Sequence, residues 1–247
     1  QHQEKNNILL STGHGELEKE QTKALVLQLS SFYNVGYINL DSNYNLKKEI
    51  DLLIIARPTI PFSEKNKFAL DQYLMNGGKI IINPVHQGKD FAGAGNTCLY
   101  GATGGKLYIR AAVGERFAVR NSGCTSVVEG TGDNACEYMT GGIVVILGNT
   151  GINFGAGMTG GLAFVYDPEK TFVDKMNQEL IEAVRVDTDD TERERLYLKR
   201  LLLDYLHETQ SEIAENILQN FRAEIRNFWM VKPKNMTVLP LDPDKGD

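Results

Sequence analysis

The sequence has few cysteines, a single tryptophan and no long hydrophobic run. Its 247 residues include three cysteines, Cys98, Cys124 and Cys136, without any Cys-x-x-Cys spacing. An odd, unpaired set argues against a disulfide framework and favours reduced thiols in a cytoplasmic compartment. No stretch approaches the roughly 20 apolar residues of a membrane-spanning helix, and the polar start Gln-His-Gln-Glu-Lys is unlike a signal peptide. We therefore expect no membrane segment in this chain.

Positive charge is also in short supply. The formal net charge is -6 and the isoelectric point is near 5.4, which argues against nucleic acid or an anionic membrane as a partner. Histidines 2, 14, 86 and 207 are scattered, without the His-x-x-His spacing of a zinc site. From the sequence we expect no metal and no cofactor.

Glycine, in contrast, recurs at a fixed interval in the second half. Leading glycines fall at 95, 114, 132 and 151, and closing glycines at 105, 123, 142 and 161, so both series advance by 18 or 19 residues. A β-rich run follows each closing glycine: Lys106–Arg110, Cys124–Val128, Ile143–Leu147 and Leu162–Tyr166. A short strand after a glycine corner, repeated at an interval too short for two helices, predicts about four coils of a parallel β-helix.

The corner glycines have a physical reason. A sharp turn stacked on identical turns requires positive φ without a Cβ, which favours glycine. Gly155-Ala-Gly157 also invites a phosphate-binding interpretation, but a nucleotide fingerprint occurs once and opens a helix, whereas these glycines recur and lead into strands. Cys98 and Cys136 fall one position apart on alternate coils, so we expect packed interior thiols and not nucleophiles.

These segments carry a family resemblance. The run from about residue 95 to 233, notably Asn96–Gly105, Gly114–Gly123 and Gly151–Gly161, resembles the C-terminal β-helix domain of the large subunit of glutamate synthase. The resemblance implies a right-handed β-helix that acts as a structural spacer without catalytic residues of its own. The family's N-terminal cysteine nucleophile and iron–sulfur ligands have no counterpart in this sequence, and the β-helix is expected to lack its earlier coils.

The first half has a different pattern. Short apolar runs, predicted to be strands, alternate with segments of helical periodicity: Asn7–Ser11, Tyr37–Asp41, Asp51–Ala56 and Lys79–Asn83. Such alternation predicts a parallel sheet with crossover helices. One helix is expected over Leu17–Ser31, burying Leu25, Leu29 and Phe32. A second is expected to begin at an N-cap, Ser63, to bury Phe68, Leu70 and Leu74, and to stop at Gly77-Gly78.

This half resembles another family. Ser11–Glu16, Leu52–Pro58 and Pro61–Lys79 are similar to the soluble domain of gliding-motility ABC-transporter auxiliary proteins. The resemblance covers about residues 5 to 86 and implies a partial flavodoxin-like fold used for assembly. The resemblance to each family stops short of residues 87–94. We interpret this segment as the junction of a composite chain, natural or engineered. The alternative is that the sequence joins pieces that are not covalently continuous there.

Helical periodicity returns near the end. Thr191 with Glu194, and Thr209 with Glu212, have the spacing of capping boxes. They predict a helical hairpin over 191–233 that covers the exposed last coil, followed by a mobile tail over 234–247.

Candidate reactive groups are sparse. His14, between Gly13 and Gly15 after the first strand, stands where parallel α/β folds bind ligands, and the loop could hold a small anion. Asp187–Asp190 lacks the glycine and distant glutamate of a calcium loop and is interpreted as a solvated helix start. No catalytic, cofactor-binding or metal-binding residue is predicted.

The whole pattern predicts four parts: an α/β half-domain (1–86), a junction (87–94), a parallel β-helix (95–190) and a helical hairpin (191–233), before the tail. The first functional hypothesis is a non-catalytic structural or interaction protein, with other protein domains or a second copy as partners through the ends of the β-helix. One alternative is a non-catalytic C-terminal part of a glutamate synthase that is active only with its other domains. Another is an anion-binding module at Gly13–Gly15.

Overall fold

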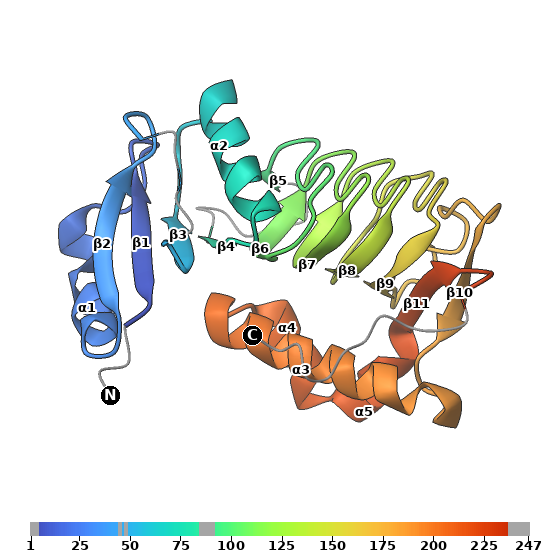
Figure 1. Ribbon diagram of the computed structural model, residues 1–247. Coiled ribbons are helices and arrows are strands. Elements are labelled where there is room, and N and C mark those ends of the chain that lie inside the picture. The colour runs from blue at the N-terminus through green and yellow to red at the C-terminus, as the bar shows by residue number, and fades with distance from the viewer. Residues whose placement is uncertain (1–4, 44–45, 47–48, 84–91, 237–247) are drawn as a thin grey trace.

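The computed structural model describes residues 5–43, 46, 49–83 and 92–236. The chain forms one mixed sheet of 11 strands in the order β10-β11-β9-β8-β7-β6-β4-β3-β1-β2, with β5 paired to β6. Helix α2 and the loops between strands lie on one side of the sheet, and α3 and α4 lie on the other (Figure 1). The architecture is of α/β character, as the alternating pattern of the first half predicts.

The N-terminal part is a parallel sheet with crossover helices. Its elements are β1 (Asn7–Thr12), α1 (Lys19–Ser30), β2 (Asn34–Asn39), β3 (Leu52–Ala56), α2 (Glu64–Met75) and β4 (Lys79–Asn83). Strand order is β2-β1-β3-β4, and all three pairs are parallel. Ser63 is the N-cap of α2, accepting a hydrogen bond from the Asn66 N–H at 3.3 Å, and the helix ends before Gly77. These predictions are confirmed.

The predicted core faces of both helices are wrong in part. Phe32 is 72% exposed and Phe68 is 65% exposed, and Leu25 is also exposed. In α1 only Thr22 is fully buried, because this helix contacts mainly β2 at the edge of the sheet. In α2, Leu74 is buried and Leu70 is partly buried as predicted, whereas Ala69 is buried in place of Phe68.

The repeat forms four consecutive parallel strands. They are β6 (Lys106–Val113), β7 (Ser122–Thr131), β8 (Thr140–Ile146) and β9 (Gly160–Tyr166). Lys106 stands opposite Thr125, Thr125 opposite Ile143, and Ile143 opposite Leu162, so the register follows the repeat interval. Of the predicted junction, residues 87–91 lie outside the described residues, and β5 (Ala92–Ala94) pairs with the end of β6.

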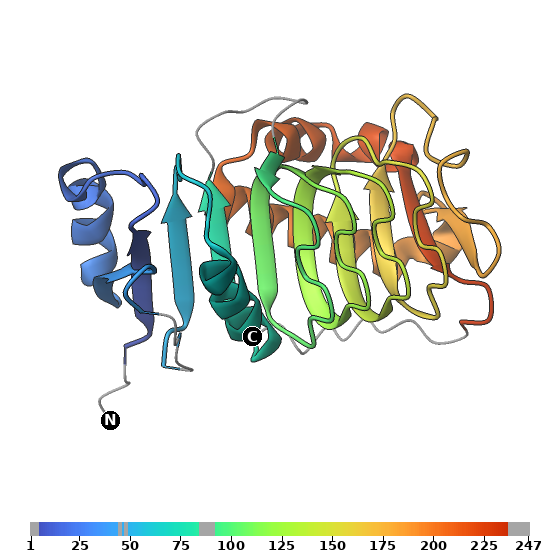
Figure 2. The ribbon, with the colours of Figure 1, turned by 90° about the horizontal axis from the view of Figure 1, so that it is seen from above.

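The two halves share the sheet. Strand β4 pairs with β6 in parallel, with Lys79 opposite Lys106, Ile80 opposite Leu107 and Ile81 opposite Tyr108. Seen from above, the strands run side by side across this seam without a break (Figure 2). The N-terminal part thus covers the edge of β6, which would otherwise be open for pairing.

The loops between the strands stack on one another as a second ladder. Every second residue has a left-handed φ, for example Asn134 at 61°, Cys136 at 60° and Tyr138 at 51°. The Cys136 N–H donates to Phe117 O and the Tyr138 N–H to Ala156 O, both at 2.8 Å, in the loops on either side. Residues other than glycine are strained at left-handed φ values. The hydrogen bonds between loops therefore stabilise a backbone conformation that could not be predicted from the sequence.

The repeated glycines serve two different purposes. Three closing glycines have left-handed φ values of 78–85°: Gly105, Gly142 and Gly161. The leading glycines do not, which corrects the expectation for them. A Cβ on Gly151 would lie 2.4 Å from the Asp133 N, and one on Gly132 would lie 2.9 Å from the Glu115 N. At these positions glycine is needed because successive loops approach too closely for a side chain.

The C-terminal part contains the predicted helices, but one strand precedes them in the sequence and another follows them. Strand β10 (Ile181–Arg185) precedes a 3-10 turn, η1 (Asp189–Thr191), and the helix α3 (Glu192–Thr209). Then follow α4 (Glu212–Gln219), α5 (Phe221–Glu224), a second 3-10 turn, η2 (Ile225–Asn227), and β11 (Phe228–Pro233). Strand β11 is antiparallel to both β9 and β10. The prediction of helix through Phe228 is wrong, and β10 and β11 were missed.

Both predicted capping boxes are also wrong. Thr191 makes no side-chain cap hydrogen bond, and its hydroxyl donates instead to Thr188 O at 3.0 Å. Ser211 caps α4, because its hydroxyl oxygen accepts from the Ala214 N–H at 3.2 Å. Thr209 lies in the last turn of α3 and donates to Tyr205 O at 2.6 Å. Lys234, in the predicted tail, is fixed by donating to Gln178 O at 2.7 Å, whereas residues 237–247 lie outside the described residues.

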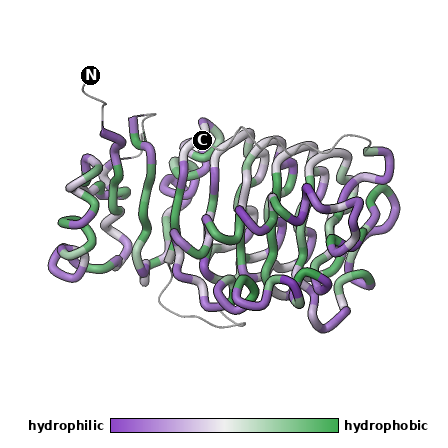
Figure 3. The backbone as a smooth tube through the Cα atoms, turned by 90° about the horizontal axis from the view of Figure 1, so that it is seen from below, coloured by the Kyte–Doolittle hydropathy of each residue, from purple (hydrophilic) through white to green (hydrophobic). Residues whose placement is uncertain are grey.

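Two hydrophobic cores lie on opposite faces of the sheet. One fills the space between the strands and the stacked loops and includes Leu107, Phe117 and Phe154. The other lies between the strands and α3, where Tyr108 and Phe164 share a cluster with Leu202. Figure 3 shows hydrophobic residues along the strands of both halves. Helix α3 therefore covers a face of the sheet and not the last strand edge of the repeat, because the edge of β9 pairs with β11.

Candidate functional site

The loop after β1 lies where the connections of the parallel sheet diverge toward β2 and β3. Its His14 is 2% exposed and stacks on Phe62 with ring centroids 4.2 Å apart. His14 Nε2 is 2.8 Å from Asn66 Nδ2 and 3.5 Å from Asp41 Oδ1. The same Asn66 amide donates to Asp41 Oδ1 at 2.9 Å, so one amide group bridges the ring and the carboxylate.

The carboxylate of Glu16 accepts hydrogen bonds from donors of this loop. Glu16 is buried and accepts hydrogen bonds from the His14 N–H at 2.6 Å and the Ser11 hydroxyl at 2.7 Å. With Asp41 close by, negative charge already surrounds the imidazole, which opposes binding of a small anion. His14 Nδ1 and Asn66 Oδ1 are buried without a hydrogen-bond partner. The sequence singled out His14, but its partners Glu16, Asp41 and Asn66 could not be assigned without the fold.

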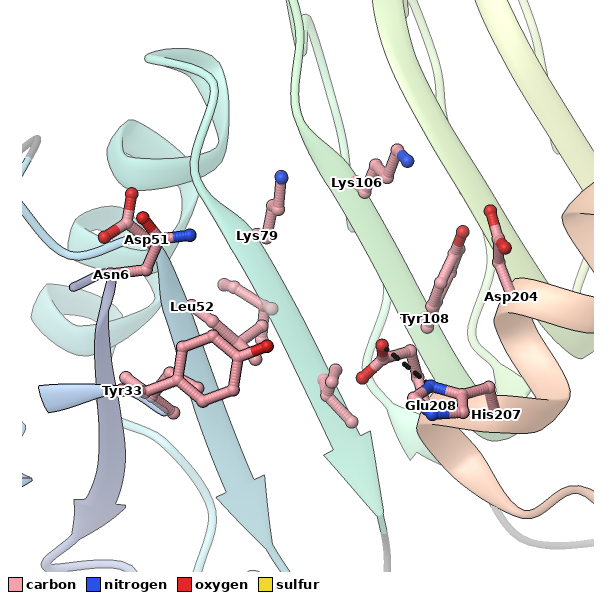
Figure 4. Close-up of a pocket in the computed structure, with 13 residues that line it drawn as sticks. Asn6, Tyr33, Asp51, Leu52, Lys79, Lys106, Tyr108, Asp204, His207 and Glu208 are labelled. Atoms are coloured by element: carbon pink, nitrogen blue, oxygen red, sulfur yellow. Dashed lines mark hydrogen bonds and ion pairs between the residues drawn. The ribbon is translucent and has the colours of Figure 1, made fainter. Parts of the chain in front are cut away.

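A groove opens on the α3 side of the sheet, at the seam between the two halves (Figure 4). Its volume is about 280 Å³, and its lining comes from β1, β3, β4, β6 and α3 together with Tyr33. Lys79 and Lys106 lie at one end, and Tyr108, Asp204 and Glu208 lie toward α3. The sequence did not identify any of these residues as a candidate for a site. It did place Lys106 and Tyr108 two positions apart on a predicted strand, and such residues lie on the same face of a sheet.

A second cavity of about 470 Å³ lies at the carboxyl ends of β6 to β9. The equivalent residues Thr131 and Thr150, each just before a leading glycine, have buried hydroxyls without a hydrogen-bond partner. Asp167 in the same wall is satisfied by the Thr171 and Phe172 N–H groups and by Trp229.

The three cysteines are free thiols in protected surroundings. Cys124 and Cys136 are fully buried and Cys98 is partly exposed. Burial raises the pKa of Cys98 to about 11 and that of Cys124 to about 12, and it also raises the pKa of Cys136. Thiols held protonated in this way are poor nucleophiles and poor metal ligands.

Other sequence candidates lie apart from one another. Asp189 and Asp190 form part of the turn before α3, as expected for a helix start. His207 is exposed and lies 3.3 Å from Glu208 Oε1, whereas His2 and His86 are outside the described residues. Among the described residues no group of three or more His, Cys, Asp or Glu side chains could hold a metal ion. In that same part of the chain, no helix is both long and apolar enough to traverse a bilayer.

Comparison with known proteins gives two family matches. A model described as the GXGXG motif matches residues 71–234, about two thirds of the chain, and a model described as an ABC-type uncharacterized transport system matches residues 5–104. The chain belongs to the GXGXG motif family. The two matches overlap over 71–104, the segment that contains β4 and the start of the repeat.

The relatives are glutamate synthases. The ferredoxin-dependent glutamate synthase of Pyropia yezoensis is 48% identical over 163 residues, 64% of this chain and 10% of the relative. The chloroplastic ferredoxin-dependent enzyme of Spinacia oleracea is 45% identical over 170 residues, 67% of this chain and 10% of the relative. Glutamate synthase [NADH] of Schizosaccharomyces pombe is 46% identical over 164 residues, 65% of this chain and 8% of the relative. The chain thus spans about a tenth of the length of these relatives.

Proposed function

We propose that this chain is a structural, non-catalytic part of a glutamate synthase, and that it contributes to glutamate formation only together with the enzyme's other domains. The observation that carries the proposal is the identity of 45–48% to glutamate synthases over 163–170 residues, about two thirds of this chain. The other hypothesis, a structural or interaction protein that functions without the other domains of the enzyme, has less support.

We further propose that residues 95–190 are a right-handed parallel β-helix of about four coils. Two observations support it: the parallel register of β6 to β9 at the repeat interval, and the hydrogen bonds that join successive loops. Such a stack is rigid because each coil is bonded to the next through both strand and loop.

The N-terminal part is proposed to be a cap from a second family, residues 1–86, joined to this stack in a composite chain. Pairing of β4 with β6 and the overlap of the two family matches support a junction through the sheet itself. On this division 191–233 is a flanking helical segment, and the ends of the stack are the surfaces that would contact other domains.

The reactive groups support a non-catalytic role. The thiols are buried and protonated, and the Gly13–Gly15 loop is filled by Glu16, which disfavours the anion-binding alternative. Three free thiols are also consistent with a reducing, cytoplasmic setting, which we propose on that ground alone.

A domain graft tests the proposal. Residues 71–234 would replace the matching region of the ferredoxin-dependent glutamate synthase 2 of Synechocystis, which is 46% identical over 163 residues. We expect the graft to retain ferredoxin-dependent glutamate formation, and the same graft with Gly142→Val to lose it together with soluble yield. A graft that purifies as a folded protein of the parent's size but forms no glutamate would contradict the proposal.

A further inference from the structure

The groove at the seam has an apolar floor. Leu52 on β3 and Ile81 on β4 line it, and Tyr33 forms the wall opposite α3 (Figure 4). Tyr33 is 37% exposed, so its ring is available for contact. A groove of about 280 Å³ is at the small end of ligand-binding pockets and suits a molecule of one or two rings.

Two lysines lie at one end of this floor and form no direct ion pair with the carboxylates that the structure describes there. Lys79 and Lys106 stand in register on adjacent parallel strands, about 4.8 Å apart along the hydrogen-bonding direction. Both side chains lie at the same end of the groove (Figure 4), and both residues are half-buried. Neither forms an ion pair or side-chain hydrogen bond with any residue that the structure describes. Like charges at directly paired positions repel, so an anion between them would relieve a real cost.

A third donor faces the same space. Tyr108 lies two residues after Lys106 on β6 and is 5% exposed, and its buried hydroxyl has no hydrogen-bond partner among the residues that the structure describes. Its ring is fixed by an edge contact with Tyr205, with centroids 5.6 Å apart at 90°. Burial and the nearby Asp204 raise the pKa of Tyr108, so the hydroxyl remains protonated and able to donate. A buried donor without an acceptor calls for an occupant.

Three carboxylates, Asp51, Asp204 and Glu208, also line the groove, and among the described residues none of them is bonded to Lys79, Lys106 or Tyr108. Asp51 accepts from the Asn7 N–H at 2.7 Å, and Glu208 lies 3.3 Å from His207 Nδ1. Asp204 stands beside Tyr108 on the α3 wall, where it repels any second negative charge. The site therefore combines an apolar floor, three donors on β4 and β6, and three carboxylates, of which Asp204 and Glu208 act on Tyr108 and limit the negative charge of what binds.

We propose that this groove binds a small monocarboxylate with a flat apolar body. Its carboxylate would lie between the Lys79 and Lys106 ammonium groups and accept from the Tyr108 hydroxyl, and its apolar body would rest on Leu52 and Ile81. The site lies on the outer face of the sheet, and it neither requires nor alters the structural role proposed above.

Titration of the full chain with 2-naphthoate tests the proposal. We expect saturable binding by calorimetry and shifts of groove amide resonances in NMR spectra. The neutral amide 2-naphthamide and the body-free anion acetate are each expected to bind at least tenfold more weakly, because each lacks one half of the recognition.

Variants assign the contacts. Lys79→Met and Lys106→Met are each expected to weaken 2-naphthoate binding about tenfold, the usual effect of losing one charge-assisted hydrogen bond. Tyr108→Phe should weaken it severalfold at an unchanged melting temperature, and Asp204→Asn should strengthen it. Lys23→Met, at an exposed position on α1, is the matched control with no expected effect.

Two outcomes would overturn the assignment. One is the absence of saturable 2-naphthoate binding to the unaltered chain. The other is binding that 2-naphthamide matches, or that persists at full strength when Lys79 and Lys106 are both replaced. Amide shifts in the unaltered chain report the location of binding even if one of the variants fails to fold.

Discussion

Lys79 on β4 lies directly opposite Lys106 on β6, and the pairing of these two strands joins the N-terminal part of the sheet to the glycine repeat. The first strand of the glycine repeat would have a free edge if β4 were absent. Instead its backbone groups are paired across the seam. We therefore expect the pairing with β4 to stabilise the first strand of the repeat.

The closing glycines are predicted to tolerate no side chain. Gly142 has a φ of 78°, and a Cβ there would lie 2.4 Å from the Cys124 carbonyl oxygen. We expect Gly142→Val to destabilise the fold by about 3 kcal/mol or more, since left-handed strain and a backbone clash add together. Thermal unfolding compared with Lys170→Ala, at an exposed position, measures this. Equal melting temperatures would show that the corner geometry is wrong.

The leading glycines look alike in sequence and differ in the structure. A Cβ on Gly151 would meet the Asp133 N at 2.4 Å, whereas a Cβ on Gly95 has no neighbour within 4 Å in the described part of the chain. Gly151→Ala should therefore cost about 1–3 kcal/mol, and Gly95→Ala should stay within about 0.5 kcal/mol of the parent. Urea unfolding of the two variants decides the point. A reversed order would refute the stacking of the loops.

A buried carboxylate should make stability depend on pH. Burial raises the pKa of Glu129 above its ordinary value of 4.5, although hydrogen bonds from Ser211 and Tyr205 and the nearby Arg110 act in the opposite direction. Because the folded state holds this proton more tightly than the unfolded state, Glu129 lowers the free energy of unfolding as pH rises through its folded pKa. We expect Glu129→Gln to reduce that loss, and the exposed Glu192→Gln to leave it unchanged. Melting temperatures from pH 4 to 8 with matching slopes for all three proteins would disprove the effect.

The isolated chain, without any other domain, is expected to release no ammonia from glutamine. Its thiols are protonated near neutral pH, because burial raises the pKa of Cys98 and Cys124 to about 11 and about 12. A coupled ammonia assay against a buffer control checks this. Cys98, Cys124 and the fully buried Cys136 would be replaced one at a time. Ammonia release by the parent chain that one of these replacements abolishes would contradict a non-catalytic role.

Sequence reasoning reached the parallel strands because their signals are local. The glycine interval located β6 to β9, and the apolar runs located β1, β3 and β4. It failed where tertiary contacts decide. Phe228–Pro233 continues a helical periodicity but lies beside β9, so backbone pairing with β9 and β10 overrides the pattern.

Candidate sites were harder to predict for the same reason. His14 was recognised by its glycine-flanked loop, but Glu16 and Asn66 reach it only through the turn after β1 and the start of α2. Lys79 and Lys106 are 27 positions apart, on either side of the predicted junction at residues 87–94. Their proximity depends on pairing between two parts that the sequence presents as unrelated.

Amide hydrogen exchange at the seam tests the central claim most directly. In the full chain we predict slow exchange over residues 106–109 of β6, comparable with β7 and β8, because β4 pairs with this part of its edge. Removal of residues 1–86 should speed exchange in β6 first and produce a larger oligomer or aggregate. A truncated chain that stays monomeric, melts at the parent's temperature and keeps β6 protected would contradict the account and leave the N-terminal part as an independent passenger.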